Sequence, residues 1–319
     1  MRFATHVHFV RDGLRRIGRA AGYTAEDIEQ SASVQVTRAA GAGVVPSVVL
    51  KVADPGEGPT PVGALHLHAG GHDLGALGPR DDDDAYVLNA TQQQAVLNAV
   101  LRTGPLSLVD RNQQTWTISD RGATAVLLKM DDVQGRVGTV GALLRKGNKD
   151  ESAVLPALPA PQVARGAIAP PRAGDSAIAR SPALLAAVRS ALKPLAETCW
   201  RADETPISAD ELQVHRLTDT TLLVSAPCWM AAYNNADAYW TTPDTAPYTL
   251  TLVTTDANDY ADGELSASHK GRGIGDCWSQ QSWLWNGNAF VETSQSTTGW
   301  CRGQPGGFWT QPTVVTQTR

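Results

Sequence analysis

The sequence is poor in charge and lacks the features of several large protein classes. Charged residues make up 18% of its 319 residues, and the formal net charge is −5. It therefore has no basic footprint of the kind that nucleic acid binding requires. No apolar run approaches the roughly 20 residues of a membrane-spanning helix. The first residues also lack an apolar signal-peptide core, so we expect no signal peptide in the chain as given.

Motifs for nucleotide or nucleophilic chemistry are missing as well. The stretch Lys270-Gly271-Arg272-Gly273 is rich in glycine but lacks the order of a phosphate-binding loop, and no helical pattern follows it. The Gly-x-Ser-x-Gly signature of serine hydrolases does not occur. The sequence thus predicts no cofactor, and it favours no catalytic nucleophile.

The cysteines are few and unevenly placed. All four lie from residue 199 onward, where eight of the nine tryptophans also occur: Cys199, Cys228, Cys277 and Cys301. No Cys-x-x-Cys spacing is present, which argues against zinc. An even number confined to one region favours two disulfides and an oxidising compartment, so we expect a periplasmic or secreted protein. Metal ligands and reduced core thiols are the alternatives.

The length and the residue patterns predict an α+β protein of two domains. We expect an N-terminal domain over 1–152, a linker rich in Pro and Ala over 153–180, and a C-terminal domain over 181–319. Both domains are expected to be rich in β-strands with one or two helices each, the second being an antiparallel sheet held by disulfides. Alternating apolar residues predict strands at 33–38 and 64–68.

Helical spacing of apolar residues predicts three helices. The first covers 92–102 after Thr91, and the second covers 121–134 with Ser119 as its cap. The third begins at Ser181-Pro182, with Leu184, Leu185, Val188 and Leu192 on its apolar face.

The stretch from Ser266 to Arg302 concentrates unusual residues. Asn286-Gly287 between two strand-like segments predicts a β-hairpin with a type I′ turn. Cys277 and Cys301 bracket this hairpin and are candidates for one disulfide. Residues 229–240 are expected to form a loop.

A charged and aromatic surface near this hairpin is the main candidate site. We select Lys270, Arg272 and Asp276, together with four nearby aromatic and amide side chains: Trp283, Trp285, Tyr233 and Asn234. Tryptophan and arginine are the usual anchors of interfaces. The same tryptophans could equally form the core, because indole N–H groups need partners wherever they are buried.

Two weaker candidates concern metal binding and hydrolysis. His66, His68 and His72 resemble part of a zinc site, but no fourth ligand can be placed, and ordinary solvent-facing histidines are the favoured explanation. The carboxylates Asp262 and Glu264, with Asp276, would suit a hydrolase that uses a carboxylate pair.

Several runs resemble a known bacterial family. The most specific are His269-Lys270-Gly271-Arg272-Gly273-Ile274-Gly275-Asp276-Cys277, Thr298-Gly299-Trp300-Cys301-Arg302 and Met130-Asp131-Asp132-Val133-Gln134-Gly135-Arg136. The chain resembles the bacterial domain-of-unknown-function family 1176 over nearly its whole length. The resemblance implies an exported protein and brings no established activity with it.

The sequence as a whole favours a non-catalytic binding or inhibitor-like protein of the cell envelope. Its partner would be an envelope protein or a glycan, recognised around Lys270, Arg272 and Asp276. The alternative is an envelope hydrolase acting on glycan or peptidoglycan. A purely structural role in the envelope is the third hypothesis.

Overall fold

The computed structural model describes residues 17–24, 30–53, 60–102, 104–157 and 159–319. The chain forms two compact units. Unit 1 contains the described residues up to Ala160 together with 274–278 and 297–313, and unit 2 contains 161–273, 279–296 and 314–319. We expected a linear division with a linker at 153–180. Instead, two short C-terminal segments that carry Cys277 and Cys301 belong to unit 1.

Unit 1 has two four-stranded antiparallel sheets and two helices in its described part. The sheets have the strand orders β1-β2-β3-β6 and β5-β4-β7-β8. The strands are β1 (Ile17–Tyr23), β2 (Ala32–Ala39), β3 (Ser47–Val52), β4 (His66–Ala69), β5 (His72–Ala76), β6 (Tyr86–Val87), β7 (Leu106–Val109) and β8 (Thr115–Ile118).

The alternation in these strands separates an apolar face from a polar one. Val34, Val36, Val48 and Leu50 are all buried and belong to one core cluster with the apolar faces of both helices. Their odd-numbered neighbours point to the opposite face of the same sheet, because successive side chains in a strand alternate. The strand predicted at 33–38 is therefore confirmed, and it lies within β2.

The two helices of unit 1 are α1 (Ala90–Leu101) and α2 (Ala123–Val133). Both predicted helices exist, but the first begins before its predicted start and the predicted cap of the second is wrong. Asn89 caps α1 and forms a reciprocal capping box with Gln92, so the helix begins before Thr91. Gly122, in a left-handed conformation, precedes α2. The apolar pattern could not reveal these starts, because capping depends on local backbone geometry.

Unit 2 is built mainly from two antiparallel sheets with helices on one of them. The sheet orders are β10-β11-β12-β13 and β14-β15-β16-β17-β18, and a two-stranded parallel pair joins β9 to β19. The strands are β9 (Gln162–Val163), β10 (Gln213–Arg216), β11 (Thr221–Met230), β12 (Asn235–Pro243), β13 (Thr251–Ala257), β14 (Asp259–Ala261), β15 (Glu264–Lys270), β16 (Trp278–Trp285), β17 (Phe290–Thr297), β18 (Gln311–Val315) and β19 (Gln317–Thr318). Trp278, Thr297 and residues 311–313, at the ends of three of these strands, are assigned to unit 1.

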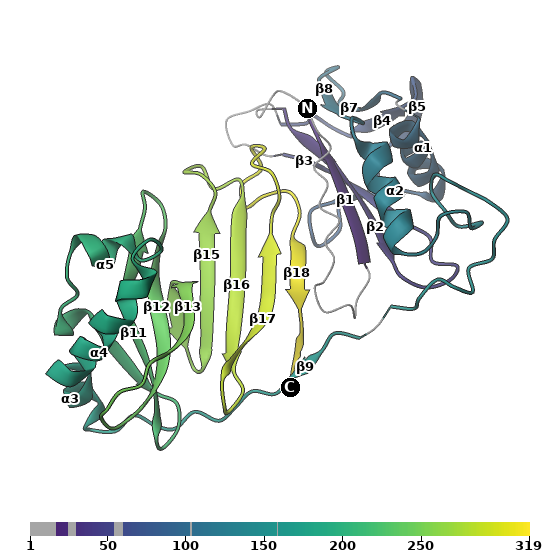
Figure 1. Ribbon diagram of the computed structural model, residues 1–319. Coiled ribbons are helices and arrows are strands. Elements are labelled where there is room, and N and C mark those ends of the chain that lie inside the picture. The colour runs from purple at the N-terminus through teal and green to yellow at the C-terminus, as the bar shows by residue number, and fades with distance from the viewer. Residues whose placement is uncertain (1–16, 25–29, 54–59, 103, 158) are drawn as a thin grey trace. The chain divides into compact units, whose positions relative to one another are not determined.

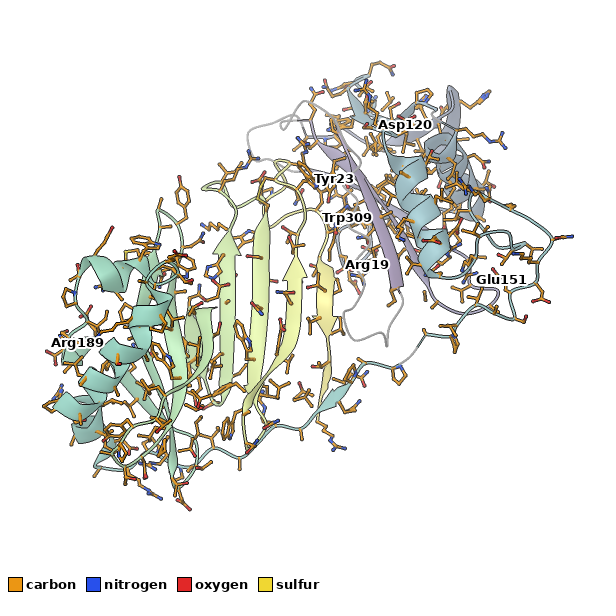
Figure 2. All side chains as sticks on the ribbon, viewed as in Figure 1. Arg19, Tyr23, Asp120, Glu151, Arg189 and Trp309 are labelled. Atoms are coloured by element: carbon orange, nitrogen blue, oxygen red, sulfur yellow. A yellow bond between two sulfur atoms is a disulfide. The ribbon has the colours of Figure 1, made fainter. Side chains whose placement is uncertain are left out.

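The helical segments of unit 2 cover the β10–β13 sheet (Figure 1). They are α3 (Asp175–Ala179), α4 (Pro182–Leu192) and α5 (Trp200–Glu204), with 3-10 turns at Lys193–Leu195 and Ala209–Glu211. Helix α4 packs its apolar face on this sheet, as the sequence predicted. Arg189 of α4 donates two hydrogen bonds to the carbonyl of Ile207, at 2.9 and 2.7 Å, and so fixes the following segment (Figure 2). No helix in the described part of the chain is long and apolar enough to cross a membrane.

The two disulfides pair Cys199 with Cys228 and Cys277 with Cys301. The predicted pairing of Cys277 with Cys301 is therefore confirmed. The hairpin at Asn286-Gly287 also exists, but its turn is not of type I′. Residues 286–289 connect β16 to β17, and of these four only Gly287 has a positive φ, at 98°, whereas a type I′ turn needs two such residues. The Asn286 side chain accepts the amide N–H of Ala289 at 2.9 Å, as Asn side chains in turns often do.

Candidate functional site

The corner predicted around Lys270 is formed in unit 2 by two segments. Residues 231–234 form the turn between β11 and β12, so the loop predicted at 229–240 is mostly strand. The Asn234 side chain donates to the Lys270 carbonyl at 2.9 Å and accepts the Lys270 amide N–H at 2.8 Å. Two hydrogen bonds from one side chain to one backbone residue hold the β11–β12 turn against the end of β15. We call Tyr233, Asn234, Lys270, Arg272 and Gly273 the Asn234 corner.

The surface of this corner combines an aromatic ring with two cations. A Cβ built on Gly273 would lie 2.9 Å from Cζ of Tyr233, so glycine permits the close approach of the ring. Tyr233 is nevertheless 62% exposed. Lys270 and Arg272 are half-buried. The corner therefore presents a tyrosine and two basic side chains on a backbone that is fixed in place.

Behind the corner lies a small aromatic and ionic group that the sequence did not indicate. His269 is buried, and its ring lies 5.0 Å from that of Trp229. Its Nε2 atom is 2.9 Å from the carbonyl oxygen of Asp256 and 3.5 Å from the carboxylate of the same residue. Since both are acceptors, Nε2 carries the proton. Burial raises the pKa of Asp256, and the charge of His269 acts in the opposite direction. Because His269 directly precedes Lys270, these contacts hold the end of β15 that carries the corner.

Three of the predicted site residues do not belong to this surface. Trp283 is 8% exposed and Trp285 is 2% exposed, and both pack in the core of unit 2 with Leu265. Asp276 is 1% exposed and lies in unit 1, where its carboxylate accepts the amide N–H of Gly303 at 2.6 Å. The prediction that the tryptophans form an exposed platform is therefore wrong. The two tryptophans are two positions apart on β16 and so share one face of the strand, and that face is turned to the core.

The predicted histidine cluster is not assembled. His66 and His68 share one face of β4, and His68 pairs with Asp73 of β5. His72 pairs with Ala69, which places it on the opposite face. The Nδ1 atom of His66 instead lies 3.2 Å from the Asp73 carboxylate. The tight turn after β4 therefore directs the third histidine away from the other two.

A second set of metal-ligating residue types is also unsuitable. In the described part of the chain, Asp276, Cys277 and Cys301 are the group whose candidate ligand atoms lie within 4.8 Å of one another. Both sulfurs belong to one disulfide, so neither is available as a thiolate.

Of the carboxylate pair selected for hydrolysis, Glu264 is engaged through its side chain and Asp262 through its backbone carbonyl. Glu264 forms a salt bridge of 2.9 Å with Arg165, which also donates to the carbonyl of Asp262 at 3.0 Å. Asp262 has a positive φ of 46°, as expected in the tight turn between β14 and β15. Arg165 thus holds the turn between β14 and β15 together with the first residue of β15.

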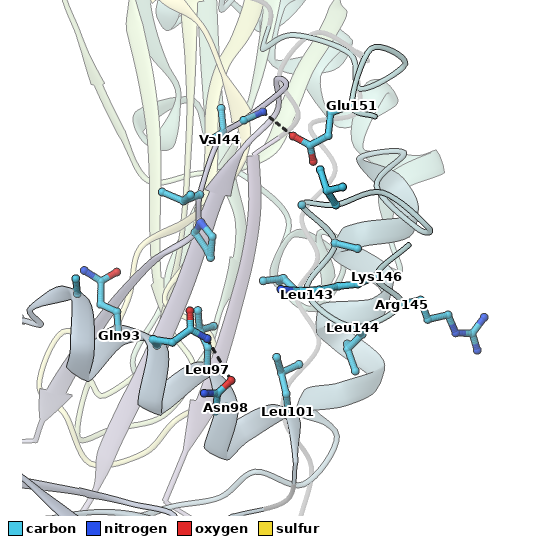
Figure 3. Close-up of a pocket in the computed structure, with 18 of the residues that line it drawn as sticks. Val44, Gln93, Leu97, Asn98, Leu101, Leu143, Leu144, Arg145, Lys146 and Glu151 are labelled. Carbon is cyan, nitrogen blue, oxygen red and sulfur yellow. Dashed lines mark hydrogen bonds between the residues drawn. The ribbon is translucent and has the colours of Figure 1, made fainter. Parts of the chain in front are cut away.

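Unit 1 contains a groove that the sequence did not indicate. It has a volume of about 930 Å³ and lies between α1, the β2–β3 turn and residues 140–146. Leu97 and Leu101 of α1 face Leu143 and Leu144 across it (Figure 3). Small-molecule pockets typically measure about 300–1,000 Å³. Arg145 points away from the groove in the same view.

Buried ion pairs hold one wall of this groove. Arg38 contacts Asp131 at 2.5 Å, and both side chains are fully buried. The other carboxylate oxygen of Asp131 accepts the amide N–H groups of Leu143 and Leu144 at 2.8 and 3.1 Å. The wall segment is therefore tied directly to α2.

A second ion pair fixes the far end of the same segment. Arg136 contacts Glu151 at 2.5 Å, and the two side chains are 0% and 8% exposed. The Gly43 amide N–H and then the Arg136 guanidinium hold the pKa of Glu151 below its ordinary value of 4.5. The run 130–136, which resembles a family segment, thus supplies both Asp131 and Arg136 of these buried pairs.

The structure thus defines an α+β protein of two β-rich units, each containing one disulfide, with a groove in one and an exposed basic corner in the other. A family model described as "Protein of unknown function (DUF1176)" matches residues 15–316, and the chain belongs to that family. It is also 28% identical over 217 residues to "Uncharacterized protein YpfG" of Escherichia coli (strain K12). This match covers 61% of the chain and 58% of the relative, so the chain spans little more than half of that relative's length. No solved structure matches the chain.

Proposed function

We propose that this protein is a non-catalytic binding protein of the cell envelope, which recognises an envelope protein or glycan through the Asn234 corner. The observation that carries the proposal is the double hydrogen bond between the Asn234 side chain and the backbone of Lys270. It holds two surface segments in a fixed relation and so reduces the entropy lost when a partner binds. The two disulfides support an oxidising location such as the periplasm.

The chemistry of the corner favours a partner with anionic or hydroxyl groups. Arg272 and Lys270 provide positive charge, and Tyr233 provides an exposed ring with a hydrogen-bonding hydroxyl. Arginine and tyrosine are enriched among the residues that dominate binding energy at interfaces. An inhibitor-like mode of action, in which the corner blocks a partner's site, uses the same contacts. The hydrolase alternative gains no support from Glu264, because that carboxylate is paired with Arg165.

The test uses the intact protein and charge-reversed variants as baits. Envelope proteins and isolated peptidoglycan from the source bacterium are presented separately to the unmodified chain and to Arg272→Glu. We expect Arg272→Glu to reduce capture at least about tenfold, because an opposed charge at an interface typically costs several kcal/mol. Arg180→Glu is the matched control, since Arg180 is an exposed arginine of the same unit and its side chain is 76% exposed.

The melting temperature of each variant distinguishes lost binding from lost folding. Equal capture by the unmodified chain and by Arg272→Glu would contradict the assignment of the surface. If neither fraction is captured by any bait, the binding function itself is wrong, and assays of cell-wall hydrolysis become the next step.

A further inference from the structure

The polar face of the β1–β2–β3 sheet in unit 1 carries two cations beside a glutamine. Arg19 lies on β1, Gln35 on β2 and Lys51 on β3. The strand register pairs Arg19 with Thr37 and Lys51 with Ser33. All these residues have odd numbers and share the face opposite the core, and Gln35 is the diagonal neighbour of both cations.

Residues 306–312, which belong to the same unit, cover this face. Trp309 donates its indole N–H to the Ser33 hydroxyl at 2.6 Å. The Arg19 guanidinium donates to the carbonyl of Thr310 at 3.0 Å. Lys51 lies over the Trp309 ring, 4.8 Å from its centroid. Arg19 and Trp309 are both labelled along β1 in Figure 2. The covering segment leaves a cavity of about 410 Å³, lined in part by Arg19, Gln35 and Lys51.

The two cations share the cavity with Asp81 and Asp83, whose side chains are exposed to solvent. Both cations are half-buried, and neither forms a salt bridge with another described residue. Burial lowers the pKa of Arg19. Burial also lowers the pKa of Lys51, and Asp83 is the first of the nearby carboxylates that oppose this effect. Because these carboxylates are exposed to solvent, an anion bound inside the cavity would still replace part of the hydration that the two half-buried cations have lost.

We propose that this cavity binds a small organic anion of about monosaccharide size, with its carboxylate or phosphate between Arg19 and Lys51 and a hydrogen bond from Gln35. The volume lies within the usual range of small-ligand sites, about 300–1,000 Å³. Asp81 and Asp83 line the same cavity and repel a highly charged anion, while they can accept hydrogen bonds from ligand hydroxyls. The ligand is therefore a polyhydroxyl compound with one anionic group.

Calorimetric titration of the full chain tests this site with three probes: glucuronate, glucose 6-phosphate and glucose. We expect at least one of the two anions to bind and glucose to bind at least about tenfold more weakly, as expected for hydrogen bonds to charged groups. Binding of glucuronate alone assigns a carboxylate ligand, and binding of glucose 6-phosphate alone assigns a phosphate ligand. Equal affinity for glucose, or no binding of either anion, overturns the proposal.

Variants assign the binding to this cavity. Arg19→Gln should weaken anion binding at least about tenfold, while Arg145→Gln, an exposed arginine of the same unit, should leave it unchanged. Melting temperatures report whether each variant is folded. If Arg19→Gln does not fold, Lys51→Gln is expected to give the same loss. Unchanged affinity in a folded variant of either cation overturns the site. The outcome is independent of the Asn234 corner, which lies in unit 2.

Discussion

Asp131→Ala should destabilise unit 1 more than any surface substitution on the same helix. The Asp131 carboxylate is fully buried, and Arg38 contacts one of its oxygens at 2.5 Å. The other oxygen accepts the amide N–H groups of Leu143 and Leu144. Removal of the carboxylate leaves a buried guanidinium without its counterion and two N–H groups without their acceptor.

The expected magnitude follows from the burial of this pair. Removal of one partner from a buried ion pair typically costs about 3–5 kcal/mol. Arg38 keeps its hydrogen bonds to Gln134 and to the Gly141 carbonyl, at 2.8 and 3.2 Å, so the lower half of that range is the better estimate. Arg38→Met together with Asp131→Ala removes both charges. The double variant should therefore cost about 1–3 kcal/mol less than the sum of the two single changes.

Hydrogen exchange measured by mass spectrometry provides the assay, because peptides from β2 and α2 report the opening free energy of unit 1 alone. The control is a pair of substitutions that removes the charges of Lys129 and Asp132. These two residues form an ion pair on α2, and their side chains are 53% and 59% exposed. That change should cost less than about 1 kcal/mol. Additive costs for Arg38 and Asp131, or an equal effect in the control, would refute the electrostatic reasoning.

Two further predictions concern unit 1. Because the folded-state pKa of Glu151 is lowered, its contribution to stability is present above pH 4.5 and is lost as the pH falls through the folded-state value. The stability difference between the unmodified chain and Glu151→Gln should therefore be largest near neutral pH and shrink below pH 4.5, as measured by urea unfolding across that range. Gly307→Ala should lower the melting temperature more than Gly306→Ala. Both glycines have positive φ, at 88° and 77°, but only at Gly307 would the new Cβ meet another residue, Thr298, at a distance that forces a shift.

Local patterns were sufficient to predict most of the fold. The alternation of β2 and the apolar spacing of α4 have a physical origin within the segment itself, because one face must be buried. Features set by the backbone were harder to predict. Asn89 caps α1, so the helix begins before the predicted residue 92, and the Asn286 side chain accepts a backbone N–H in a turn that is not of the predicted type I′. In each case a nearby side chain satisfied the backbone in a way that the hydrophobic pattern does not record.

The candidate sites were predictable only where a single segment carries them. Lys270 ends β15 and Arg272 follows it, and both are half-buried, so their role as a binding site stays a prediction. The burial of Trp283 and Trp285 could not be predicted from the sequence. Alternation along β16 determines which residues share a face, but it does not determine which face is buried. The position of His72 relative to the other two histidines could not be predicted for a related reason. A shift of one position in the turn after β4 moves a side chain to the other face of the sheet.

Each site described in the structure is completed by a polar side chain that is distant in sequence. Asp131 holds the wall of the groove to Arg38, 93 residues away. Asn234 fixes the corner through Lys270, 36 residues away, and Trp309 joins its covering segment to Ser33 across 276 residues. Asn234 belongs to the corner and Trp309 lines its cavity, whereas Asp131 lies outside the lining of the groove. Contacts between residues so distant in sequence leave no local motif. It follows that a conservative change at Asp131 should alter the groove although every residue that lines it stays unchanged, a pattern opposite to that expected if the lining residues alone determined its shape.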